Sequence, residues 1–136
     1  MDKTDKAIHI IADDRERKGS VIQILRDMEE VVVQIDRLST GDYFADHILV
    51  FERKTLKDFA SSIIDGRLFR QMTRLAKSTF KGVLILEGTG RELSEMGVRR
   101  EALQGALINT SLILGIPVLR SKGPFETAKL IVYATR

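Results

Sequence analysis

The sequence has no cysteine and only two histidines among its 136 residues. Without cysteine there can be no disulfides, no thiolate catalysis and no zinc site built on Cys ligands. With two histidines, a His-rich metal site is also a poor interpretation. Any metal would therefore be held by carboxylates, which favours Mg²⁺ or Mn²⁺.

Long hydrophobic runs and linker-like segments are also missing. No stretch approaches the ~18 apolar residues that a membrane span needs, and Met1-Asp2-Lys3 does not open a signal peptide. No membrane partner is expected, and the location expected is intracellular: cytoplasm or nucleoid in a prokaryote, nucleus in a eukaryote. With no repeat and no Gly/Ser/Pro-rich run, residues 1–136 are predicted to form one domain.

Strand and helix patterns alternate along the chain. Strands are predicted at 7–12, 31–38, 42–45, 48–54, 83–87 and 117–119, and helices at 19–29, 55–65, 67–79, 100–114 and 124–135. Ser20 is the predicted cap of the first helix. This order, with one hairpin between 42 and 54, predicts an α/β domain whose central mixed β-sheet is covered by helices on both faces.

The second strand of the hairpin ends in three charges, Glu52-Arg53-Lys54, directly after an apolar run. Successive strand residues point to opposite faces, so Glu52 and Lys54 share one face and Arg53 lies on the other. A turn at the middle of the hairpin places Asp42 opposite Glu52, on the same face. Two carboxylates and a lysine are thus predicted to lie together.

Two carboxylates about 5 Å apart repel each other unless a cation lies between them. In one interpretation Asp42 and Glu52 hold Mg²⁺, and Lys54 orients an attacking water or stabilises developing charge on a phosphate. The alternative is a cross-strand salt bridge on a solvated face. Both interpretations stay open on these residues alone.

Further charged residues flank this hairpin. Asp13 and Arg15 follow the first strand, at the sheet edge where sites gather in open α/β folds; there Asp13 would add a metal ligand and Arg15 a phosphate contact. Thr55 and Asp58 have the spacing of a helix capping box. Asp58 is therefore either a cap or a site residue.

Positive charge gathers on one predicted helix. The segment 66–81 contains no Asp or Glu, and its basic residues recur every three or four positions, within an arc of about 80°. These residues are Arg67, Arg70, Arg74, Lys77 and Lys81. A single-sign stripe favours contact with a phosphate backbone, although pairing with acids elsewhere is the alternative. Phe69 and Phe80 are predicted to be core, which leaves no aromatic platform for base stacking.

The compound pattern of GDY at 41–43, ERK at 52–54 and Asp58 resembles the GD…ERKxxxD motif of the XPF/Hef-type structure-specific endonucleases, a branch of the restriction-endonuclease-like nucleases. The resemblance continues through Asp13-x-Arg15-Glu16, SIIDGRLFxQ, VLILEG, GIPVL and PFETAKLI, so it covers nearly the whole chain. It implies a Mg²⁺- or Mn²⁺-dependent nuclease that cuts branched DNA such as flaps, forks and splayed arms, in DNA repair or recombination. The active-site positions it implies are Asp13, Arg15, Asp42, Glu52, Arg53, Lys54 and Asp58.

The same resemblance implies pairing of nuclease domains, as a homodimer or as a heterodimer with a related subunit. Candidate surfaces are the apolar helices 102–114 and 125–133. Family members usually also carry a tandem helix-hairpin-helix domain, and some a helicase; neither is expected within residues 1–136. A non-catalytic DNA-binding subunit and a four-way-junction resolvase of the same fold are the alternative functions.

Overall fold

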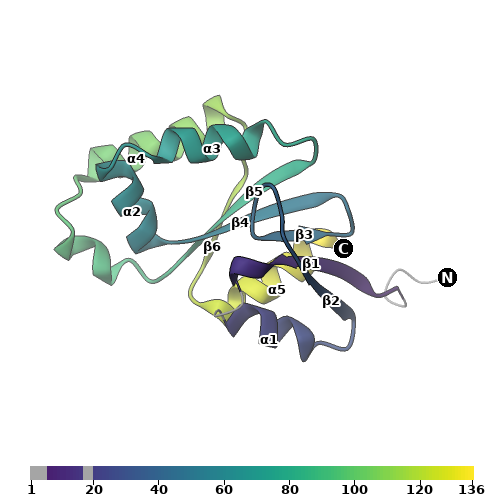
Figure 1. Cartoon of the computed structure of the whole chain (residues 1–136). Helices are drawn as coiled ribbons and strands as arrows, with labels where there is room; N and C mark the ends of the chain where they lie inside the picture. Colours follow the sequence, from purple (N-terminus) through teal and green to yellow (C-terminus); the bar gives the residue numbers. More distant parts are fainter. Residues whose placement is uncertain (1–5, 17–19) are drawn as a thin grey trace.

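The computed structural model describes residues 6–16 and 20–136, and within them six strands form one sheet in the order β2–β1–β3–β4–β5–β6 (Figure 1). The strands are β1 (Ile8–Asp13), β2 (Val31–Asp36), β3 (Tyr43–Ala45), β4 (Leu49–Thr55), β5 (Lys81–Glu87) and β6 (Val118–Ser121). β3 runs antiparallel to β1 and β4, whereas β1–β2, β4–β5 and β5–β6 are parallel. The predicted mixed sheet is confirmed.

Helices cover both faces of this sheet. On one face lie α1 (Ser20–Arg26) and α5 (Pro124–Thr135), and on the other α2 (Leu56–Ile64), α3 (Leu68–Ala76) and α4 (Arg100–Ile108) (Figure 1). Short helical turns complete the chain: η2 (Asp14–Glu16), η3 (Arg91–Glu95) and η4 (Asn109–Ile113), a π turn that continues α4. No helix in the described ranges combines the length and apolarity that a membrane span requires.

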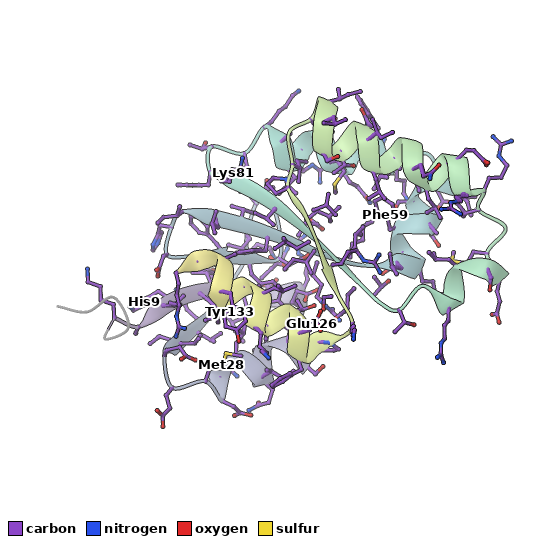
Figure 2. All side chains as sticks on the ribbon, turned by 180° about the vertical axis from the view of Figure 1, so that it is seen from behind. His9, Met28, Phe59, Lys81, Glu126 and Tyr133 are labelled. Carbon is purple, nitrogen blue, oxygen red and sulfur yellow. The ribbon has the colours of Figure 1, made fainter. Side chains whose placement is uncertain are left out.

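Each face of the sheet has its own apolar core. Tyr43 and Phe51 lie in the core under α1 and α5, and Phe59 and Met72 lie in the core under α2 and α3. Figure 2 shows Phe59 in the second layer, with Met28 and Tyr133 in the layer of α1 and α5. Because β4 alternates between the two cores, each residue at its charged end belongs to one layer or the other.

Element boundaries differ from the sequence prediction by a few residues. β4 continues to Thr55, which pairs with Glu87 of β5 and is also the N-cap of α2. β5 begins at Lys81 because its pairing with β4 starts there. The helix α1 ends at Arg26 instead of residue 29, and its predicted start at Gly19 lies outside the described residues.

Candidate active site

The hairpin of β3 and β4 brings Asp42 and Glu52 together. Its turn is formed by Asp46 and His47, both in the left-handed region (φ 49° and 57°), as a tight hairpin turn requires. The resulting register pairs Tyr43 with Phe51, so the next residues outward are Asp42 and Glu52, as predicted.

A glycine lets the chain approach β4 just before Asp42. Gly41 has φ +79°, and a Cβ at this position would lie 2.3 Å from Val50 Cγ1. A larger residue would both strain the backbone and push this segment away from β4. Asp42 in turn is held through its Oδ2, which accepts the backbone N–H of Arg53 at 2.7 Å.

The two half-buried carboxylates raise each other's free energy in the ionised state. Burial and the charge of Glu52 raise the pKa of Asp42 to about 8. Burial, together with the charge of Glu16, also raises the pKa of Glu52, against the lowering effects of the Lys54, Arg15 and Arg74 charges. The pair therefore lacks the positive charge that would let both groups ionise at neutral pH.

Asp13 lies at the end of β1, and its carboxylate oxygens already accept hydrogen bonds. It is 1% exposed, and its carboxylate accepts from Arg15 Nε (2.6 Å), Arg15 Nη2 (3.1 Å) and the backbone N–H of Leu38 (2.8 Å). These bonds, chiefly that to Arg15, lower the pKa of Asp13. Arg15 is exposed and its charge acts on Glu52, while the Asp13 charge acts on Asp42 and the Asp42 charge on Arg15, so both residues lie close to the carboxylate pair.

The described part of the chain contains no group of three or more His, Cys, Asp or Glu side chains arranged to hold a metal. Of the three predicted metal ligands, the fold brings Asp42 and Glu52 together, whereas the oxygens of Asp13 are engaged by Arg15 and Leu38. Metal coordination by Asp13 stays a prediction.

Arg53 lies behind the site. Its guanidinium forms ion pairs with Glu87 and with Glu16 (3.7 Å), on the face covered by α1 and α5. Tyr43 Oη donates to Glu16 Oε2 at 2.6 Å, and Thr127 Oγ1 of α5 donates to Glu87 Oε1 at 3.0 Å. This is the face that strand alternation predicts. Only the backbone N–H of Arg53 forms a hydrogen bond with Asp42, whereas its guanidinium pairs with Glu16 and Glu87.

Lys54 lies close to Glu52 of the carboxylate pair, and Asp58 lies in the first turn of α2. The Lys54 charge is the strongest of those lowering the pKa of Glu52. Thr55 caps α2, because its Oγ1 accepts the backbone N–H of Asp58 at 3.0 Å, as the capping-box spacing predicts. The Asp58 side chain is exposed, and among the described residues it makes no hydrogen bond or ion pair, so it is not used by the cap.

The helix α3 and its capping residues Arg67 and Lys77 present four of the five predicted basic residues to solvent. The fifth, Lys81, was predicted on the helical stripe but is the first residue of β5, because the helix ends at Ala76. Arg67 pairs with Asp65 at 3.1 Å, whereas Arg70, Arg74 and Lys77 form no ion pair within the described ranges. These three line an open groove of about 560 Å³ together with Thr40, Phe69, Thr73 and Ser78. Because Thr40 is close in sequence to Asp42 and the Arg74 charge acts on Glu52, this groove adjoins the carboxylate pair.

The prediction that Phe69 and Phe80 are core residues is wrong: Phe69 is 60% and Phe80 42% exposed. The buried row of α3 is Leu68, Met72 and Leu75, so Phe69, about 100° further round the helix, faces outward. Phe80 lies directly before β5, against the ring of Phe44, with centroids 4.7 Å apart. The spacing of Leu68, Met72 and Leu75 was the signal that could have identified Phe69 as exposed.

A model of the ERCC4 domain matches residues 12–134. The chain belongs to the ERCC4 domain family. The XPF structure from Aeropyrum pernix in complex with DNA superposes with a TM-score of 0.86 at 34% identity, over 94% of this chain and 63% of that one. The resemblance to XPF/Hef-type nucleases and the single α/β domain of that fold are thereby confirmed.

Two curated relatives carry the same ERCC4 region within longer chains. The 3′-flap repair endonuclease Xpf of Saccharolobus solfataricus is 27% identical over 91% of this chain and 53% of its own length. A protein of Methanocaldococcus jannaschii named for ATP-dependent RNA helicase activity is 38% identical over 93% of this chain and 15% of its own. The chain thus spans about half of the first relative and a small part of the second.

The donor set of this ERCC4 domain fits a divalent cation. Asp42 and Glu52 offer carboxylate oxygens, the ligands that Mg²⁺ and Mn²⁺ prefer. Their raised pKa values show that negative charge at this position lacks compensation. Lys54 forms no ion pair with Asp42 or Glu52 within the described residues, which argues against the salt-bridge alternative. The arrangement can concentrate a cation beside an ammonium group and next to a basic groove.

Proposed function

We propose that this ERCC4 domain is a metal-dependent, structure-specific DNA endonuclease acting on branched DNA, in repair or recombination. The observation that carries the proposal is the uncompensated carboxylate pair, Asp42 and Glu52, beside Lys54. Two comparisons support it: one relative is named as a flap endonuclease, and a solved XPF structure contains DNA.

The proposed roles follow from the positions of the side chains. Asp42 and Glu52 hold Mg²⁺ or Mn²⁺, which when bound polarises the scissile phosphate and lowers the pKa of a water molecule. Lys54, next to Glu52, orients that water or stabilises charge on the phosphate. Arg15, held by Asp13, contacts a phosphate. Asp13 as a further ligand and Asp58 as a further site residue belong to the same proposal.

Two more groups complete the proposed site. Arg53 acts from behind: its guanidinium anchors β4 to Glu16 and Glu87, which positions Glu52 and Lys54 on either side of it. Arg67, Arg70, Arg74 and Lys77 on α3 bind the phosphate backbone. Neither group needs to contact the metal to affect cleavage.

A cleavage panel tests the proposal. Labelled flap, fork, splayed-arm and four-way-junction DNAs are incubated with the protein in Mg²⁺ or Mn²⁺, next to a linear duplex. We expect branched DNAs to be cut, and Glu52→Gln to lower the rate at least about a hundredfold, because one oxygen ligand loses its charge. Glu101→Gln, the same change on exposed α4, is the matched control. Equal rates for Glu52→Gln and the wild-type protein would refute the proposal.

The same panel separates the alternatives. A non-catalytic DNA-binding subunit would bind branched DNA and never cut it in any metal. A four-way-junction resolvase would make symmetric paired cuts in junctions and leave flaps intact. The flap name of the Saccharolobus solfataricus relative favours flap cleavage over both.

Pairing of two nuclease domains belongs to the same proposal. Large apolar side chains are exposed on the surfaces named for pairing: Ile108, Leu112 and Ile113 on α4 and η4, and Phe125 and Tyr133 on α5. Such patches mark interaction sites. Light scattering of the purified protein would give a dimer mass, and Leu112→Glu would shift it to the monomer; a wild-type monomer at high concentration would refute self-pairing and leave a related subunit as the partner.

A further inference from the structure

The groove between α3 and the loop before β3 has the size and the lining of a ligand site. Its volume of about 560 Å³ lies within the range typical of small-molecule and nucleotide pockets. Its lining combines one aromatic ring, three cations and three hydroxyl groups: Phe69, Arg70, Arg74, Lys77, Thr40, Thr73 and Ser78. The groove is open to solvent.

Phe69 contributes nothing evident to the fold. It is 60% exposed, it lies outside the apolar core beneath α3, and no aromatic neighbour in the described part of the chain stacks on it. A large ring exposed inside a groove is an unfavourable arrangement unless a ligand covers it. Thr73, which also lines the groove, has its Oγ1 buried without a hydrogen-bond partner in the described residues.

The cations form a row beside the ring. Arg70, Arg74 and Lys77 are three or four positions apart, so they follow one side of α3, while Phe69 and Thr73 form the adjacent row. The rise from Arg70 to Arg74 is about 6 Å at ~1.5 Å per residue. A flat apolar surface beside a line of positive charge matches the two halves of a nucleotide chain, the base and the phosphate.

From this arrangement we infer that the groove binds an unpaired DNA strand, with one base stacked on Phe69 and its phosphates on Arg70 and Arg74. In a duplex both faces of each base are covered by neighbouring bases, so only an unpaired base can present a face to the ring. The three cations disfavour an apolar protein segment as occupant. The inference rests on the proposed function, because it assigns the unpaired arm of a branched substrate to a specific position beside the carboxylate pair.

Binding measured in EDTA tests the groove without cleavage. The probes are a flap DNA with 2-aminopurine in the unpaired arm and a blunt duplex of equal length, and the variants are Phe69→Ala, Phe69→Leu and Phe69→Tyr. We expect Phe69→Ala to weaken flap binding by roughly tenfold and duplex binding by less than about twofold, given the strength of base–aromatic stacking. Quenching of 2-aminopurine by the protein should be lost in Phe69→Ala and Phe69→Leu and kept in Phe69→Tyr.

The inference is overturned if Phe69→Ala weakens both DNAs equally or neither, or if Phe69→Leu behaves like Phe69→Tyr, since apolar bulk would then explain the effect. Because Phe69 is exposed, all three variants should melt within a few degrees of the wild-type protein. A protein that shows the quenching pattern and never cuts DNA supports the groove and refutes the endonuclease. Normal cleavage with no effect of the Phe69 substitutions supports the endonuclease and refutes the groove.

Discussion

Neighbouring charged side chains on the two faces of β4 lie in opposite electrostatic environments. On one face, Glu52 lies beside Asp42; burial raises the pKa of both carboxyl groups, and the charge of Glu52 raises that of Asp42 further. On the other face, Arg53 lies between Glu16 and Glu87, and its pKa, lowered by burial but raised more by these partners, is above the usual value. Glu52 and Arg53 are adjacent on β4, yet the fold leaves the negative charge at Glu52 uncompensated and compensates the positive charge of Arg53.

This difference distinguishes the candidate site, Asp42 and Glu52, from the ion pair of Arg53 and Glu87 that supports it. Buried charges that serve stability alone are paired, as Arg53 is with Glu87. A pair of like charges that the fold does not neutralise raises the free energy of the folded state, and such groups are typical of functional sites. The same contrast holds for cations: Arg53 is paired, whereas Arg70 and Arg74 on α3 form no ion pair within the described residues.

Arg53→Met should have the largest effect on stability. Removal of the guanidinium leaves Glu87, which is 5% exposed, without its ion pair. We expect a loss of about 3 kcal/mol in the free energy of unfolding, measured by urea denaturation without metal. The double variant Arg53→Met with Glu87→Met should recover part of that loss, because no buried charge is left unpaired. Lost cleavage with unchanged stability would instead assign the guanidinium to the chemistry.

Asp42→Asn should increase the free energy of unfolding, whereas Arg53→Met should decrease it. In the folded protein the pKa of Asp42 is raised to about 8, against about 3.9 in an unfolded chain. The folded state therefore binds more protons between these values, so this contribution to wild-type stability falls as the pH rises from about 3.9 to about 8 and levels off above that. Asparagine removes this dependence and keeps an oxygen that can accept the Arg53 N–H.

The measurement is thermal melting without metal at pH 4 and at pH 9. At pH 4 the variant and the wild-type protein should melt together. At pH 9 the variant should be more stable by about 2 kcal/mol, less than the full linkage of the shift because solvent screens a half-buried pair. Mg²⁺ should raise the melting temperature of the wild-type protein only. A variant less stable than wild type at pH 9 would favour the salt-bridge interpretation.

The unpaired cations of α3 give a smaller effect, in binding. Arg70→Ala with Arg74→Ala should weaken DNA affinity roughly tenfold and flatten its salt dependence by about one unit of slope per lost phosphate contact. Lys122→Ala, at the end of β6, is a control for general loss of charge. An unchanged salt slope would place the DNA on another surface.

The smallest effect is expected at the cap of α2. Thr55→Ala removes the bond from the Asp58 N–H to Thr55 Oγ1 and should cost about 1 kcal/mol in stability. Thr55→Ser keeps the hydroxyl and should be close to neutral. Asp58→Asn keeps the cap as well, so a loss of cleavage there at unchanged stability would assign the Asp58 carboxylate to the site.

Local patterns were enough to predict the hairpin and its carboxylate pair. Alternation along a strand and a short turn at Asp46-His47 determine which residues face each other, and both are properties of neighbouring residues. The same holds for the N-cap at Thr55, which depends on a spacing of three residues. The stripe of positive charge on α3 likewise needs only the helical period.

Partners and exposure needed the tertiary structure. That Arg53 meets Glu16 and Glu87 depends on β5 and the η2 turn packing around β4 from distant parts of the chain. That Phe69 faces solvent depends on which side of α3 meets the sheet. The sequence by itself determined which side chains alternate along each strand and which charged residues are present. Only the packing of the layers decided which charges are compensated, because burial and pairing are properties of elements brought together in space.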